Sequence, residues 1–92
     1  MELRIHKKDQ SKVQEIISEL GFSSALTGDV FSVNTDGFGL GLFLELEDIG
    51  ISYMSTDDGV RSVFMPDHGS YEEDVDEEFP EVLEKFEEYL RS

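Results

Sequence analysis

The sequence FGLGLFLELE, residues 38–47, contains the longest regular alternation of apolar residues in the chain. Every even-numbered residue in it is phenylalanine or leucine, and the odd positions hold glycine, phenylalanine or glutamate. Side chains of a β-strand point alternately to its two faces, so the even-numbered residues would form one continuous apolar row. The pattern predicts the central strand of a sheet, with this row buried.

Shorter segments on either side are predicted to complete the sheet. Val30–Asn34 also alternates and is expected to pair with residues 38–47 as a hairpin. Residues 23–28 are small and polar, which is typical of a loop. We expect two further strands at residues 51–55 and Val60–Met65.

A turn and a short N-terminal strand extend this pattern. Asp58 and Gly59 stand between the last two predicted strands, and the Asp-Gly pair tolerates the positive φ angles of a tight hairpin. Residues 2–6 alternate between polar and apolar, which predicts a fifth strand that ends at His6. A lone histidine at this place is expected to be a solvated strand end, without a catalytic or ligand role.

The first predicted helix begins at Ser11, which forms a capping-box pattern with Gln14. Gly21 stands where a left-handed C-terminal cap is needed, and Phe22 can fold back onto the helix. The apolar stripe of this helix consists of Val13, Ile16, Ile17 and Leu20. These are ordinary core-forming signals, and they assign no function.

The second predicted helix runs from Pro80 to about Leu90, since proline suits the first helical turn. Its buried stripe is expected to comprise Phe79, Val82, Leu83, Phe86 and Leu90. Residues 66–78 contain few apolar side chains and are predicted to be an acidic loop that leads into this helix. The fold class predicted is α+β: an antiparallel meander of about four strands, or five, with two helices packed on the sheet.

The composition limits the class of protein. With 92 residues, of which 38% are hydrophobic, residues 1–92 are expected to form a single domain with its own core. The sequence has no cysteine, which excludes disulfides, thiolate metal sites and cysteine nucleophiles. It has no apolar run near the ~20 residues of a membrane span, and we expect a cytoplasmic protein.

The charge is strongly negative and unevenly distributed. Twenty-two acidic residues against seven lysines and arginines give a net charge of −15. Residues 72–92 hold ten acids against Lys85 and Arg91, a local charge of −8. Such a field repels nucleic acid, whose binding requires clustered positive charge. A basic protein, such as a nuclease or another nucleic-acid-binding protein, is the expected partner.

The acidic tract that leads into the second helix is the candidate binding surface. On a helix, carboxylates three or four residues apart are separated by about 4 to 6 Å along the axis, comparable with the ~3.4 Å per phosphate of one DNA strand. Mimicry of a phosphate backbone is therefore feasible, whereas the simpler alternative is a solvated helix face. The candidate partner-binding residues are Asp74, Asp76, Glu77, Glu81, Glu84 and Glu88.

Two partial matches to metal-binding and catalytic motifs are incompatible with the predicted structure. A calcium-loop match that starts at Asn34 and ends at Glu45 would have to coincide with the apolar residues of the predicted strand. Asp67, His68 and Ser70 are the residue types of a serine hydrolase, but neighbours on one loop cannot adopt triad geometry. We predict no metal site, no cofactor and no catalytic residues.

Three classes of function remain. The leading hypothesis is a non-enzymatic inhibitor that neutralises a basic, nucleic-acid-binding protein, in the manner of a toxin-immunity or phage anti-defence protein. The alternative is an adaptor or regulatory subunit that binds a protein through a sheet edge or through the face that carries Gly39 and Gly41. An enzyme ranks third, because no convergent acid, base or nucleophile can be identified.

Overall fold

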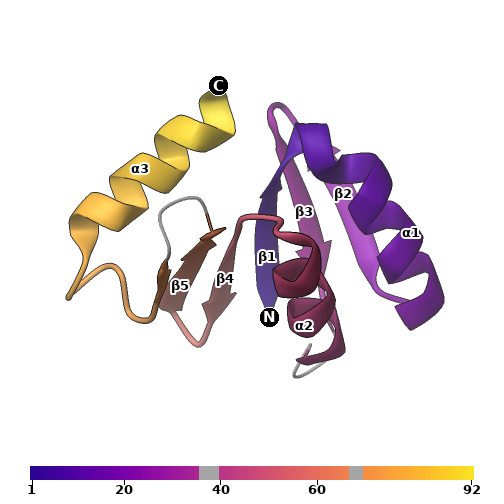
Figure 1. Ribbon diagram of the computed structural model, residues 1–92, viewed down its shortest axis with the longest axis horizontal. Helices are drawn as coiled ribbons and strands as arrows, with labels where there is room; N and C mark the ends of the chain where they lie inside the picture. The colour runs from indigo at the N-terminus through magenta and orange to yellow at the C-terminus, as the bar shows by residue number, and fades with distance from the viewer. Residues whose placement is uncertain (36–39, 67–69) are drawn as a thin grey trace.

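The structure, a computed structural model, describes residues 1–35, 40–66 and 70–92 (Figure 1). Its elements are β1 (Glu2–His6), the 3-10 helix η1 (Lys7–Asp9), α1 (Gln10–Leu20), β2 (Ser23–Thr27), β3 (Val30–Asn34), α2 (Leu40–Ile49), β4 (Tyr53–Asp57), β5 (Val60–Met65), β6 (Ser70–Glu72) and α3 (Pro80–Arg91). The α+β class and the antiparallel sheet are confirmed. The described part has three α-helices where two were expected, and the three-residue β6 adds a strand at one edge.

The strands lie in the order β2-β3-β1-β4-β5-β6, and every neighbouring pair is antiparallel. The N-terminal strand β1 is therefore inside the sheet, where Leu3 pairs with Val33 on one side and with Ser55 on the other. From β1 to β4 the elements follow the β-α-β-β-α-β order of a split β-α-β arrangement. The expected simple meander is wrong, because β1 separates β3 from β4.

Helix α2 replaces the predicted central strand. In the helix Leu42 and Leu46 are four residues apart on one side and fully buried, whereas Leu44 remains 57% exposed. Residues 38–47 contain no β-branched residue, and leucine and glutamate both favour helices. The alternating row is therefore not one buried face, and the strand prediction was wrong; Phe38 lies outside the described residues.

Helices α1 and α2 end with the same C-terminal motif. Gly21 and Gly50 adopt left-handed conformations, with φ of 77° and 75°. After α2, the N–H of Ile51 donates to the carbonyl of Leu46 at 2.9 Å, and both side chains are buried in the same cluster. This is the Schellman arrangement. The predicted cap at Gly21 is confirmed, and the equivalent signal at Gly50 marks the end of a helix that the sequence analysis missed.

The start of α1 differs from the prediction. The helix begins at Gln10 with Asp9 at the N-cap, and no side-chain cap hydrogen bond forms. Gln14 Nε2 instead donates to Ser24 Oγ on β2 at 3.5 Å. The predicted capping box between Ser11 and Gln14 is therefore wrong, since η1 carries the chain directly from β1 into the helix.

The sequence predicted the turn of one hairpin and missed a strand of the other. Asp58 and Gly59 have φ of 50° and 78° and join β4 to β5, which confirms the predicted turn. Residues 23–28 were predicted to be a loop, but Ser23–Thr27 forms β2 and pairs with β3 across a two-residue turn. Four of the five residues of β2 are exposed, so this edge strand has no hydrophobic alternation by which to recognise it.

Two apolar clusters lie on opposite faces of the sheet. The odd-numbered residues of β1, with Phe31, Val33 and Tyr53, pack against α1 and α2. On the other face, α3 packs its Phe86 and Leu90 over Met54, Val63 and Met65. Figure 1 shows α1 and α2 beside β1, β2 and β3, and α3 beside β5.

Each helix layer covers only part of its face. Helices α1 and α2 cover the β2, β3 and β1 half of one face, and α3 covers the β4 and β5 half of the other. The predicted stripe of α3 is confirmed, with Phe86 and Leu90 buried and its remaining members partly buried. Parts of the sheet on both faces are therefore left without a helix over them.

His6 is buried, and the prediction of a solvated strand end was wrong. Its exposed fraction is 4%. His6 Nδ1 accepts from the backbone N–H of Lys8 at 3.0 Å, which leaves Nε2 protonated to donate to the Ser92 carbonyl at 2.8 Å. The ring also lies 4.9 Å from that of Tyr89. His6 therefore ties the end of α3 to the central strand.

Candidate functional site

The predicted acidic surface on α3 is exposed. Glu81, Glu84 and Glu88 point away from the Phe86 and Leu90 side of the helix, and Glu77 is exposed in the turn before it. At ~1.5 Å per residue, neighbouring carboxylates of the helix are separated by roughly 4 to 6 Å along its axis. None of these four makes an ion pair with any residue in the described ranges. We call these four residues the α3 acidic face.

Asp74 and Asp76, also predicted as partner-binding residues, have structural roles in the turn before α3. Asp74 has φ of 51°, and its carbonyl accepts from the N–H of Glu78 at 3.1 Å. Asp76 accepts from the Nε of Arg61 at 2.9 Å and pairs also with its Nη2, and this pairing lowers the pKa of Asp76 and raises that of Arg61. Both groups are partly solvated, so the pair is a modest contribution to stability.

Residues 70–78, within the segment predicted to be a loop, contain a short strand and specific contacts to β5. Ser70–Glu72 forms β6 against β5, and the buried Val75 donates its N–H to the carbonyl of Arg61 at 3.0 Å. Together with the Arg61–Asp76 pair, these contacts attach the acidic segment before α3, residues 70–78, to β5. The α3 acidic face therefore has a fixed position relative to the sheet.

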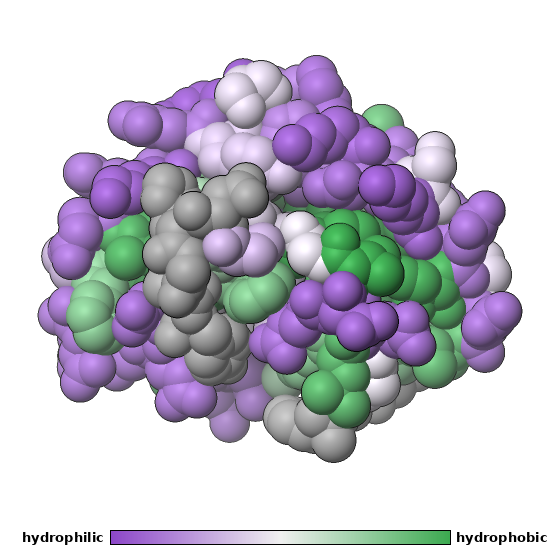
Figure 2. Space-filling model, viewed as in Figure 1, coloured by the Kyte–Doolittle hydropathy of each residue, from purple (hydrophilic) through white to green (hydrophobic). Residues whose placement is uncertain are grey.

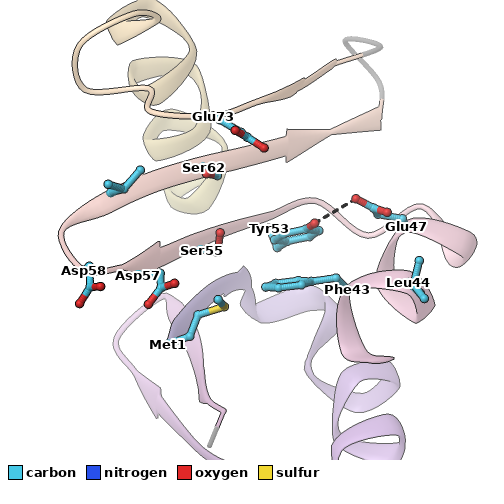
Figure 3. Close-up of a pocket in the computed structure, with 11 residues that line it drawn as sticks. Met1, Phe43, Leu44, Glu47, Tyr53, Ser55, Asp57, Asp58, Ser62 and Glu73 are labelled. Carbon is cyan, nitrogen blue, oxygen red and sulfur yellow. Dashed lines mark hydrogen bonds between the residues drawn. The ribbon is translucent and has the colours of Figure 1, made fainter. Parts of the chain in front are cut away.

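A groove that the sequence analysis did not predict lies on the other face, between α2 and the β4–β5 hairpin (Figure 3). It is an open hollow of about 490 Å³. Its described lining comprises Met1, Phe43, Leu44, Glu47, Tyr53, Ser55, Asp57, Asp58, Val60, Ser62 and Glu73. These residues come from segments far apart in the sequence, so no local motif could reveal the groove. We call this site the hairpin groove.

The walls of the hairpin groove combine aromatic rings with carboxylates. The rings of Phe43 and Tyr53 are stacked, with centroids 5.3 Å apart. Tyr53 Oη donates to Glu47 Oε1 at 3.1 Å, which fixes that carboxylate at the α2 end. Figure 3 shows Asp57 and Asp58 at the opposite end, beyond Ser55.

Ser55 and Ser62 face each other across β4 and β5 at the base of the groove. Their exposed fractions are only 8% and 9%. Neither hydroxyl makes a hydrogen bond within the described part of the chain, and no fully enclosed polar atom there lacks a partner. Both hydroxyls must therefore open onto the groove, because a buried hydroxyl without a partner is costly.

The space-filling view separates the two kinds of surface. Hydrophilic side chains cover the region of α3, whereas hydrophobic ones reach the surface around α1 and α2 (Figure 2). Leu44 and Val60, which both line the hairpin groove, are 57% and 46% exposed. The groove thus has apolar side chains available at its rim.

The other predicted features are placed as follows. Asn34 is on β3 and Glu45 on α2, and no group of three or more histidine and acidic side chains fit to hold a metal occurs among the described residues. Asp67 and His68 lie outside those residues. Gly41 is an exposed residue of α2 with open space beside it, so the expected strand face with Gly39 does not exist in the described part. None of the described helices is both long and apolar enough to cross a membrane.

Comparison with known protein families, with curated proteins and with solved structures finds no match to this chain.

Proposed function

We propose that this protein is a non-enzymatic acidic binding protein that inhibits a basic, nucleic-acid-binding protein by occupying its positively charged surface. The observation that carries the proposal is the α3 acidic face: Glu77, Glu81, Glu84 and Glu88 are exposed and unpaired in the described structure, on a chain of net charge −15. A surface made for solubility alone does not require so large a charge, which weakens the folded state through self-repulsion.

The spacing of the α3 acidic face supports competition with a phosphate backbone. The helical carboxylates are separated by roughly 4 to 6 Å along the axis, and the helix packs over β5. A basic groove that accepts a row of phosphates can accept such a row of carboxylates. The proposed activity is therefore displacement of nucleic acid from the partner.

The experiment uses the parent and a variant as paired baits in an extract of the native host. The variant carries Glu77→Gln, Glu81→Gln, Glu84→Gln and Glu88→Gln. A control variant loses four exposed charges elsewhere, through changes at Glu15, Glu19, Glu45 and Asp48. We expect a basic protein that the parent and the control capture and the α3 variant loses, and we expect the parent to displace labelled nucleic acid from it. A captured partner that the α3 variant retains equally well would contradict the proposal.

An adaptor that binds through the edge of the sheet is a second candidate. β2 is at one end of the sheet, and its outer edge has no strand partner among the described residues. Leu26 on this strand is 51% exposed. An extended segment could add to such an edge by main-chain hydrogen bonds. Leu26→Pro would remove an outward-pointing N–H of this edge, because the alternate residue Ala25 bonds to Ser32 on β3, and it would leave the α3 acidic face unchanged, so the two candidates can be separated.

A further inference from the structure

We infer that the hairpin groove is a docking site for an extended, arginine-bearing segment of a basic protein. This inference rests on the proposed function for the class of partner, but it places a second contact on the face of the sheet opposite α3. Three features of the groove support it: its charge, the two serine hydroxyls at its base and its shape.

The charge of the groove calls for a cationic occupant. Its described lining carries the four carboxylates of Glu47, Asp57, Asp58 and Glu73 and no lysine or arginine. The amino group of Met1, also a lining residue, donates to the Thr35 carbonyl at 3.5 Å. Like charges that converge on a hollow of about 490 Å³ attract a cation of matching size.

The arrangement suits an elongated polycation better than a metal ion. The carboxylates belong to α2, to the β4–β5 turn and to the segment after β6, and no metal-binding group is found among the described residues. Tyr53 and Asp57 are the first and last residues of β4, so the two ends of the groove are separated by roughly 13 Å at ~3.3 Å per residue. An extended segment of five residues spans this length, and its side chains two and four positions apart point to the same side.

The chemistry of the walls favours arginine. A guanidinium group has five N–H donors and stacks well on aromatic rings. The groove offers carboxylates at its ends and the hydroxyls of Ser55 and Ser62 at its base, with Phe43 and Tyr53 along one wall. Ser55 and Ser62 are more than nine-tenths buried as residues, and their hydroxyls have no partner in the described structure, so these hydroxyls can accept N–H groups from the occupant.

The rim can hold the apolar part of the same segment. Leu44 on α2 and Val60 on β5 are exposed on opposite sides of the groove. The methylene groups of an arginine side chain pack readily against such residues while the guanidinium lies among the polar groups. The exposed apolar side chains thereby gain a partner that the free protein does not supply.

The test uses a fluorescent peptide in which three arginines alternate with glycines, so that all three face the groove. Two matched peptides replace arginine by lysine or by citrulline, which is neutral and nearly isosteric. We expect the arginine peptide to bind best and the citrulline peptide to bind about tenfold more weakly or worse. Arginine amide alone should bind weakly; if it matched the peptide, the groove would be a small-cation site and the inference would be overturned.

Protein variants locate the binding. A groove variant carries Glu47→Gln, Asp57→Asn and Glu73→Gln, and the control variant carries Glu81→Gln, Glu84→Gln and Glu88→Gln, so each loses three charges. The groove variant should lose about tenfold in affinity and the control no more than about threefold, because only the former removes direct contacts. Equal losses would mean non-specific attraction and would overturn the inference.

A variant that alters no charge tests the contribution of the two serine hydroxyls. Ser55→Ala with Ser62→Ala removes the base of the groove without altering charge, and should weaken the arginine peptide several-fold, whereas Ser32→Ala on the opposite face should not. Amide chemical shifts on peptide addition should change at β4 and β5. Shifts confined to α3 would refute binding in the hairpin groove but would leave the proposed function standing. Failure of the α3 bait experiment would contradict the proposed function but would not affect these peptide measurements.

Discussion

The α3 acidic face and the hairpin groove are both acidic, but they differ in shape and in what surrounds each carboxylate. The glutamates of α3 project from a convex helix into water. In the groove, Glu47 is held by the Tyr53 hydroxyl, and the hydroxyls of Ser55 and Ser62 form the base of a hollow. Each region carries four carboxylates, whereas only the groove offers directional contacts. A run of charged residues in a sequence therefore indicates electrostatic attraction but not the place where a partner is recognised.

The two regions should also contribute differently to binding. Exposed charges act over about a Debye length, roughly 10 Å at 0.1 M salt, and mainly change the association rate. Contacts made in a partly enclosed groove act at short range and mainly change the dissociation rate.

The largest expected effect comes from removing the core beneath each region. Phe86→Ala under α3 should cost about 3 to 5 kcal/mol, and Leu42→Ala under α2 about 2 to 5 kcal/mol, because both side chains are fully buried. Urea denaturation measures both. Leu44→Ala is the matched control, since Leu44 is 57% exposed, and should stay within about 0.5 kcal/mol. Equal losses at Leu42 and Leu44 would indicate a buried strand rather than the helix α2.

A smaller effect is expected from releasing the end of α3 from β1. His6→Ala removes the bonds to the Lys8 N–H and the Ser92 carbonyl, and should cost about 1 to 3 kcal/mol. His6→Gln, whose amide can still donate as Nε2 does, should lose less. Thermal melting measures the stability of both variants. If His6→Ala melted like the parent, α3 would not depend on this contact for its position.

Stability at low pH tests the Arg61–Asp76 pair, which attaches the acidic segment before α3 to β5. The pair lowers the pKa of Asp76 in the folded protein, so its stabilisation is present above the unfolded pKa of ~3.9 and is lost as pH falls through the folded value. Asp76→Asn should therefore reduce the melting temperature slightly at neutral pH. It should also make the decrease in melting temperature below about pH 4 smaller than in the parent. Glu81→Gln, which removes a carboxylate without an ion pair in the described structure, is the control. An unchanged drop in Asp76→Asn would argue against the pair.

The smallest expected effect is that of salt on the free protein. Screening weakens repulsion among exposed like charges, so the melting temperature should be higher in about 0.3 M than in about 0.02 M NaCl. The α3 variant with four glutamines should show a smaller increase than the parent. A flat or falling trend in the parent would contradict a concentrated acidic surface.

The parts of the fold that sequence predicted are those with local signals. The turn at Asp58 and Gly59, the cap at Gly21 and the stripe of α3 each depend on residues adjacent in sequence or on one helix. Residues 40–49 were misjudged because the same leucines satisfy an alternating pattern and a helical one, and the decisive cap at Gly50 was not recognised, since a strand was predicted from residue 51 on. A short segment with leucine at every second position fits an amphipathic strand and also a helix that buries leucines four residues apart.

The candidate site was predicted only in part, for a related reason. The exposure of Glu81, Glu84 and Glu88 follows from helical periodicity on α3. The hairpin groove requires α2 to lie beside β4, and that placement depends on the order of the strands in the sheet. The central position of β1, which decides this order, has no signal in five residues of sequence. The burial of His6 was missed for the same reason.

The most direct test of the account is the binding kinetics of the captured basic partner with three proteins: the parent, the α3 variant and the groove variant. The account predicts that the α3 variant associates more slowly and with a weaker salt dependence, whereas the groove variant dissociates faster and keeps most of the association rate. Association and dissociation constants that are the same for all three proteins, at low and at physiological salt, would contradict it.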